Sequence, residues 1–193
     1  RALHTRGILR SPLAWQVTLF LGINSLVYYV IIGWLPAILI SHGYSEAQAG
    51  SLHGLLQLAT AAPGLLIPLF LHHMKDQRGI AAFVALMCAV GAVGLCFMPA
   101  HAITWTLLFG FGSGATMILG LTFIGLRASS AHQAALSGMA QSVGYLLAAC
   151  GPPLMGKIHD ANGDWSVPLL GVAILSLLMA IFGLCAGRDK EIR

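Results

Sequence analysis

Polar side chains recur at helical spacing within otherwise apolar stretches of this 193-residue sequence. A separation of four residues places two side chains on the same face of a helix. The pairs with this spacing are Asn24 and Tyr28, His53 and Gln57, and Gln141 and Tyr145. Amides and hydroxyls can hydrogen-bond a polar solute, and tyrosine rings can stack on a planar one. These residues are therefore candidates for binding a small polar molecule.

Three more residues join this candidate substrate-binding set. Tyr29 follows Tyr28, and Ser113 and Thr116 lie near one face of a glycine-rich stretch. For any one of these residues, a hydrogen bond between two helices explains the polarity as well as a contact with substrate does. We call each row of polar side chains along one helix face a polar stripe. The polar stripes taken together favour a polar cavity.

His53 is the only histidine clearly inside an apolar stretch. Because imidazole changes charge near neutral pH, His53 is a candidate to carry a proton or to bind the solute. The alternative is a neutral, hydrogen-bonded packing histidine. The four cysteines show no CxxC or Cys/His ligand spacing, so the sequence predicts neither a metal site nor a cofactor.

Ser113 raises the question of an intramembrane serine protease. The motif of those enzymes is Gly-x-Ser-Gly, whereas Phe111 stands two residues before Ser113 and the last apolar stretch contains no histidine. A nucleophile without a base lacks activation. HExxH and nucleotide-binding GxxxxGK[ST] motifs are also absent. The sequence therefore predicts no enzymatic activity.

The scarcity of charged residues predicts the helices that must position these side chains. Only 8% of the residues are charged, against roughly a quarter in soluble domains. A helix needs about 20 apolar residues to cross the hydrocarbon layer. We predict an all-α membrane protein with six transmembrane helices in residues 13–187, between a linker 1–12 and a tail 188–193. The expected spans are 14–40, 50–71, 80–98, 103–126, 134–154 and 167–186.

The distribution of basic residues predicts the orientation. Placing the loops alternately on two sides leaves Lys157 alone on one side and the other nine basic residues opposite. This positive-inside bias predicts cytoplasmic termini. The same bias accounts for the basic pI of about 9.1, so the pI does not indicate a protein that binds nucleic acid. The basic start, which lacks an initiator Met, is typical of an internal linker, so we expect a piece of a longer membrane protein.

The polar stripes lie on the first, second, fourth and fifth spans, which are therefore predicted to line a cavity, with the third and sixth in supporting positions. Glycines and prolines are frequent in these spans, and Gly110 and Gly114 form a GxxxG pair that favours close helix packing. A second class of function remains open: a six-span assembly subunit that pairs with partners through its glycine faces.

Six spans with cytoplasmic ends, polar stripes on the first, second, fourth and fifth spans, and a basic first linker resemble the C-terminal half of a major facilitator transporter. The resemblance implies two inverted three-helix repeats, here residues 14–98 and 103–186, and an N-terminal six-helix half as partner. The loop 72–79 is similar to the superfamily's acidic-basic signature, with Asp76, Arg78 and Gly79 in place. The resemblance implies a gating role for Asp76 and Arg78.

The segments Tyr29-x4-Trp34-Leu35-Pro36 and Gly43-x-Ser45-x3-Ala49-Gly50-Ser51-Leu52 resemble the cyanate transporter family, which includes cyanate permeases and 2-nitroimidazole exporters. This resemblance implies alternating-access transport of a small polar nitrogen compound across the lipid bilayer of the bacterial inner membrane. Trp34 and Pro36 are expected at the outer end of the path, with a gating role. Protons are a candidate coupling ion.

Overall fold

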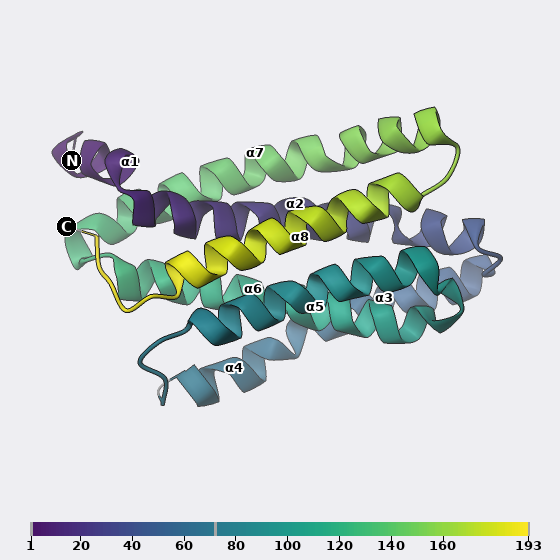
Figure 1. Ribbon diagram of the computed structural model, residues 1–193, viewed down its shortest axis with the longest axis horizontal. Helices are drawn as coiled ribbons and strands as arrows, with labels where there is room; N and C mark the ends of the chain where they lie inside the picture. The colour runs from purple at the N-terminus through teal and green to yellow at the C-terminus, as the bar shows by residue number, and fades with distance from the viewer. Residues whose placement is uncertain (1, 72, 193) are drawn as a thin grey trace.

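Each predicted span corresponds to a long helix, or in one case a helix pair, in the computed structural model, which describes residues 2–71 and 73–192. The predicted all-α membrane fold is confirmed, and the helices run side by side (Figure 1). Their bounds are α1 Ala2–Arg10, α2 Pro12–Ser41, α3 Glu46–Ala61, α4 Pro63–Leu71, α5 Arg78–Phe97, α6 Ala102–Arg127, α7 Ser130–Asn162 and α8 Ser166–Ala186, with a 3₁₀ turn η1 at Pro99–His101.

Local sequence signals set where the helices begin. Ser11 caps α2, because its hydroxyl accepts the Ala14 N–H, and Pro12 occupies the first turn, where no N–H is needed. Ser45 and Gln48 form a reciprocal capping box at the start of α3. The second predicted span is divided at Ala62 into α3 and α4, since the proline that follows has no N–H to continue the hydrogen-bond ladder.

Within the described residues, five segments are long and apolar enough to cross a membrane: α2, α3 with α4, α5, η1 with α6, and α8. Helix α7, the fifth predicted span, is the longest at 33 residues but is less apolar than those five. It runs alongside them over the length of the bundle (Figure 1). It also continues to Asn162, eight residues beyond the predicted end at 154, so it includes much of the expected outer loop.

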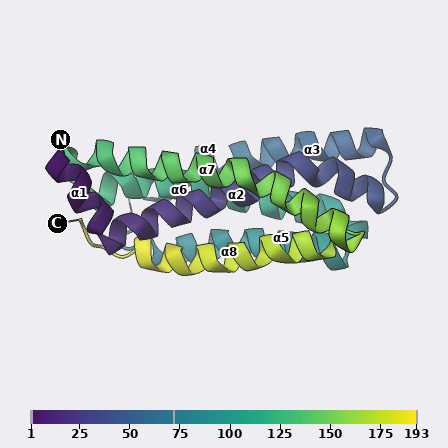
Figure 2. The same cartoon turned by 90° about the horizontal axis from the view of Figure 1, so that it is seen from above.

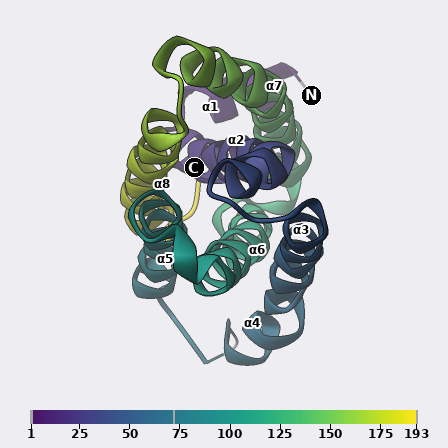
Figure 3. The same ribbon diagram turned by 90° about the vertical axis from the view of Figure 1, so that its right-hand side faces the viewer.

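Both ends of the described chain lie at the same end of the bundle (Figure 1). We call this the terminal end; it also carries the loops 73–77 and 128–129, and the turns 42–45 and 163–165 lie at the opposite end. Seen end-on, α2 lies between α7 and α8, and α6 lies between α5 and α3 (Figure 3). Helices α5 and α8 pack against each other. Exchanging α2, α3 and α5 for α6, α7 and α8 preserves these pairings, as an arrangement of two three-helix units would; that the units are inverted repeats stays a prediction.

Helix α6 approaches its neighbours closely through glycine. A Cβ atom at Gly114 would lie 2.1 Å from the carbonyl oxygen of Thr60, and one at Gly110 would lie 2.7 Å from the Ala59 Cβ. The predicted GxxxG pair therefore forms the contact between α6 and α3. Small residues allow such backbone contact in lipid, where hydrophobicity does not drive helices together.

Residues 2–10 of the expected linker are helical and form α1, which crosses the terminal end obliquely (Figure 2). Ile8 is buried there, while Arg6 and Arg10 are exposed. Three residues included in the sequence predictions, Arg1, His72 and Arg193, lie outside the described residues.

Candidate substrate cavity

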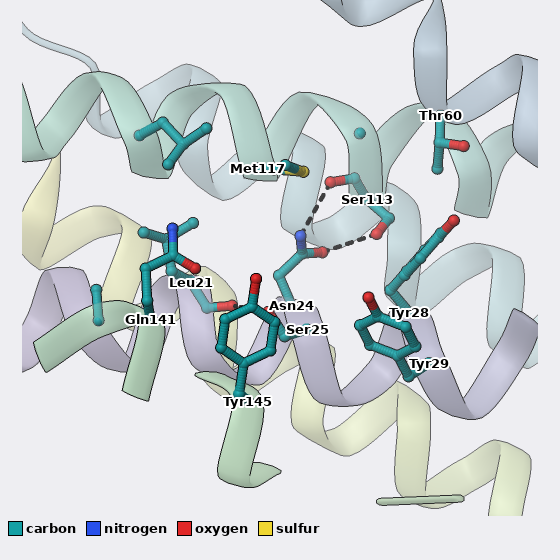
Figure 4. Close-up of a pocket in the computed structure, with 13 residues that line it drawn as sticks. Leu21, Asn24, Ser25, Tyr28, Tyr29, Thr60, Ser113, Met117, Gln141 and Tyr145 are labelled. Atoms are coloured by element: carbon teal, nitrogen blue, oxygen red, sulfur yellow. Dashed lines mark hydrogen bonds between the residues drawn. The ribbon is translucent and has the colours of Figure 1, made fainter. Parts of the chain in front are cut away.

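A cavity of about 310 Å³ opens on one side of the bundle, and its lining side chains come from α2, α3, α6 and α7 (Figure 4). This volume is at the small end of the range for ligand pockets. The lining consists of Leu21, Asn24, Ser25, Tyr28, Tyr29, Thr60, Ser113, Gly114, Met117, Leu121, Ala140, Gln141 and Tyr145. These four helices are those expected from the polar stripes, and neither α5 nor α8 contributes a described residue.

Asn24 and Ser113 form a reciprocal hydrogen-bonded pair between α2 and α6, drawn as dashed lines in Figure 4. The Asn24 Nδ2 donates to the Ser113 carbonyl oxygen at 3.1 Å, and the Ser113 Oγ donates to the Asn24 Oδ1 at 2.8 Å. Both residues are buried. The pair therefore joins the first helices of the two predicted repeats, and its polar atoms already have protein partners.

The more accessible polar side chains are Tyr29, Gln141 and Tyr145. Tyr29 is 43% exposed and Tyr145 is 66% exposed. Tyr28 and Tyr29 meet edge to face with ring centroids 5.3 Å apart. Gln141 and Tyr145 have side chains that make no hydrogen bond within the described part of the chain, so their amide and hydroxyl groups are free to meet a solute. The open side of the cavity is thus polar and aromatic.

Three residues of the candidate set do not line this cavity. Thr116 is completely buried, and its hydroxyl donates to the Gly112 carbonyl of the preceding turn. His53 and Gln57 lie on α3 outside the lining. Of the nine predicted substrate-binding residues, the structure brings together the other six: Asn24, Tyr28, Tyr29, Ser113, Gln141 and Tyr145.

His53 has a partner at each ring nitrogen. Its Nε2 lies 2.8 Å from the Ile32 carbonyl oxygen, and its Nδ1 lies 3.3 Å from the Gln57 Nε2. A carbonyl can only accept and an amide nitrogen can only donate, so a neutral ring with its proton on Nε2 satisfies both contacts. This geometry favours the packing interpretation of His53 over that of a proton carrier.

The lining contains no Asp, Glu, Lys, Arg or His. An ion held in this cavity would find no opposite charge among the described lining residues, and transfer of a charge from water into such a site is costly. Hydroxyl and amide groups can still hydrogen-bond a neutral solute, and the tyrosine rings can stack on it. The cavity is thus suited to an uncharged polar molecule.

The two predicted gating residues at the outer end lie on α2, near the opposite end of the bundle. The Trp34 indole N–H donates to the Pro152 carbonyl at 2.9 Å, and its ring centroid is 5.1 Å from that of Trp165. Trp34 therefore links α2 to α7 and α8. Pro36 lies inside α2, which continues through it to Ser41. Neither residue lines the cavity.

The other two predicted gating residues form a local pair on the surface of the terminal end. The Arg78 Nη2 lies 2.8 Å from the Asp76 Oδ2, and both side chains are more than a third exposed. The Arg78 backbone N–H, the Arg78 side chain and its charge lower the pKa of the Asp76 carboxyl. Asp76 therefore stays ionised at neutral pH, and the pair is lost only as the pH falls through that lowered pKa.

Sequence reasoning missed Arg127, the buried cation of the same end. Arg127 is 3% exposed at the end of α6. Its guanidinium donates to the Ala186 carbonyl at 2.9 Å, to the Gly187 carbonyl at 3.1 Å and to the Gln77 Oε1. It therefore ties the ends of α6 and α8 to the residue before α5. The sequence gives no sign of this role, because Arg127 is one of several basic residues next to a span.

Sequence reasoning also left Ser25, Thr60 and Met117 out of the site, although all three line the cavity. Thr60 could have been included, because it lies seven residues after His53 and so shares a helix face with His53 and Gln57. Ser25 and Met117 carry no such periodic signal.

No family model matches the chain. The chain is 97% identical to the 2-nitroimidazole transporter of Escherichia coli (strain K12), over 100% of this chain and 49% of that protein. It is 40% identical to the uncharacterized transporter YycB of Bacillus subtilis (strain 168), over 98% of this chain and 48% of the relative. It is 29% identical to the cyanate transport protein CynX of Escherichia coli (strain K12), over 89% of this chain and 46% of the relative.

The chain thus spans about half the length of these curated relatives. All three carry names of transport proteins, in agreement with the helical membrane fold and the polar cavity. The chain belongs to the cyanate and 2-nitroimidazole transporter family of the major facilitator superfamily.

Proposed function

We propose that this chain forms the C-terminal six-helix half of a secondary transporter that moves a small, uncharged, polar nitrogen compound of the nitroimidazole type. The observation that carries the proposal is the uncharged cavity of about 310 Å³, lined by Asn, Ser, Thr, Gln and Tyr side chains from four helices. The name of the 97% identical relative, a 2-nitroimidazole transporter, supports the solute class. Cyanate, an anion, fits the uncharged lining less well.

The proposed mechanism is alternating access, with the solute held between this half and an N-terminal half. The cavity is open on one side, where Tyr29 and Tyr145 are exposed, and a second half facing that side would complete its wall. Proton coupling would use a titratable group outside this lining, since His53 is satisfied in its neutral form. The alternative of an assembly subunit is not favoured, because the relatives are named as transport proteins.

The proposed location is the bacterial inner membrane, with the terminal end facing the cytoplasm. Arg10, Lys75, Arg78, Arg127 and Arg188 all belong to the terminal end, as the positive-inside rule requires for a cytoplasmic face. Lys157 lies in the last turns of α7, near the opposite end.

A transport measurement tests this proposal. In the full-length protein, Tyr145→Ala should reduce transporter-dependent 2-nitroimidazole flux by about tenfold, the equivalent of about 1.4 kcal/mol of lost binding. The phenol has no described hydrogen-bond partner and is exposed, so its removal should leave the fold intact. The measurement is the cellular content of 2-nitroimidazole, determined by chromatography at matched amounts of membrane protein.

Ser142→Ala is the matched control, because Ser142 is an exposed neighbour on α7 that does not line the cavity. It should transport normally. Equal flux for the Tyr145 and Ser142 variants would show that the cavity is not part of the transport path.

Water access gives a second prediction. In a full-length protein without native cysteines, Gln141→Cys should react with a membrane-impermeant maleimide, because Gln141 is an exposed lining residue. Thr116→Cys should stay unlabelled in the folded protein, because that site is completely buried. Labelling is read as a mass shift on a denaturing gel. Protection at both positions would instead favour a dry assembly interface.

A further inference from the structure

A cleft of about 530 Å³ at the terminal end is separate from the substrate cavity. It lies between the corner where α1 meets α2 and the tail that follows α8. The residues that matter in its lining are Arg10, Ser11, Leu13, Arg188, Lys190 and Glu191. Three cations against one carboxylate give the cleft a net positive charge.

The cations of the cleft have N–H groups that donate to no described residue. The Arg188 Nε donates to the Cys185 carbonyl at 2.9 Å, and its Nη2 donates to the Gln16 Oε1 at 3.2 Å. These two contacts orient the guanidinium and leave the N–H groups of Nη1 without a described partner. The side chains of Arg10 and Lys190 make no hydrogen bond or ion pair within the described residues. The cleft therefore offers one oriented and two adaptable cations to an anion.

Outside the cleft lining, neighbouring turns of α1 and α2 expose apolar and aromatic side chains of the kind expected at the depth of lipid headgroups. Trp15, in the first turn of α2, is 39% exposed, and its indole N–H donates to the Leu9 carbonyl at 2.8 Å. Leu9 is itself 50% exposed. Tryptophan is enriched at the membrane–water boundary, and α1 crosses the end of the bundle there with its arginines exposed (Figure 2).

We propose that this cleft binds the phosphate group of an anionic phospholipid. Guanidinium and ammonium groups form charge-assisted hydrogen bonds with phosphate oxygens, and basic pockets at this depth suit anionic headgroups. The exposed Leu9 and Trp15 offer apolar surface to the acyl chains, which inorganic phosphate would leave unused. The inference needs only that the bundle spans a bilayer, so it is independent of the transported solute.

Native mass spectrometry of the full-length protein in detergent tests this site. The probes are phosphatidylglycerol, phosphatidylcholine with the same acyl chains, and inorganic phosphate. The wild type should retain phosphatidylglycerol in preference to phosphatidylcholine. Each direct contact of a cleft cation with the phosphate should contribute about fivefold in affinity, so Arg10→Gln with Lys190→Gln should weaken phosphatidylglycerol binding about twenty-fivefold. Inorganic phosphate should not displace the lipid.

The matched control is Arg6→Gln with Lys75→Gln, which removes the same charge from exposed positions of the same end outside the cleft. It should bind phosphatidylglycerol like the wild type. Equal losses in the two double variants, or equal retention of the two lipids by the wild type, would overturn the site. Displacement by inorganic phosphate would overturn the lipid assignment. Should the double variant fail to fold, Lys190→Gln alone tests the site. Its affinity for phosphatidylglycerol should fall about fivefold, and an unchanged affinity would overturn the site.

Discussion

Gly114→Ala is expected to prevent stable folding of the full-length protein, although it adds a single methyl group. A Cβ atom at Gly114 would lie 2.1 Å from the Thr60 carbonyl oxygen and 2.8 Å from its carbonyl carbon. Both are backbone atoms, so no side chain can move aside, and α6 would have to separate from α3. Overpacking costs about 1–3 kcal/mol where side chains can adjust, and this site should reach or exceed that range.

Gly125→Ala on the same helix is the control, because a Cβ atom there meets nothing within 4 Å. It should be neutral or stabilising, since alanine favours a helix over glycine by about 1 kcal/mol. The measurement is the yield of monodisperse protein and its melting temperature, followed by tryptophan fluorescence. Similar melting temperatures for the two variants would show that α6 and α3 do not touch through Gly114.

Arg127→Gln is expected to destabilise the protein by about 3 kcal/mol, the order of effect seen when a buried, hydrogen-bonded charge loses its contacts. The guanidinium donates to the carbonyl oxygens of Ala186 and Gly187 and to the Gln77 side chain, and it is buried. The shorter glutamine amide cannot reach all three acceptors. The ends of α6 and α8 should therefore separate from the start of α5.

Arg78→Gln provides the comparison, since it removes an equal charge at the first residue of α5, where Arg78 forms an exposed pair with Asp76. Exposed ion pairs contribute about 0–1 kcal/mol, so this variant should melt close to the wild type. Both variants are compared by thermal unfolding in the same detergent. If Arg78→Gln were the more damaging of the two, the structural role assigned to Arg127 would be wrong.

The architecture was predictable from the sequence for a simple reason. A helix that crosses a membrane must satisfy its backbone internally and expose apolar side chains, so long uncharged stretches mark the spans almost directly. Polar residues at four-residue spacing, such as Asn24 and Tyr28, then mark the faces turned away from lipid. This is why the four cavity-lining helices were identified without coordinates.

The individual contacts were not predictable in this way. Periodicity shows that a side chain faces the bundle interior, but it does not show which group lies across from it. Thr116 shares a helix with Ser113, yet its hydroxyl is satisfied within α6, whereas Ser113 meets Asn24 on another helix. His53 likewise belongs to a polar stripe but is held by the Ile32 carbonyl outside the cavity.

The terminal end shows the same difference between what the sequence predicts and what only the packing decides. The resemblance to the superfamily's signature loop singled out Asp76 and Arg78, whereas Arg127 was only counted with the other basic residues that flank spans. Only the packing of three distant segments buries Arg127 and supplies its acceptors at Gln77, Ala186 and Gly187. The sequence alone determined which faces avoid lipid, because that depends on local polarity. The tertiary structure decided which polar groups remain free for a solute, because that depends on partners far away in the chain.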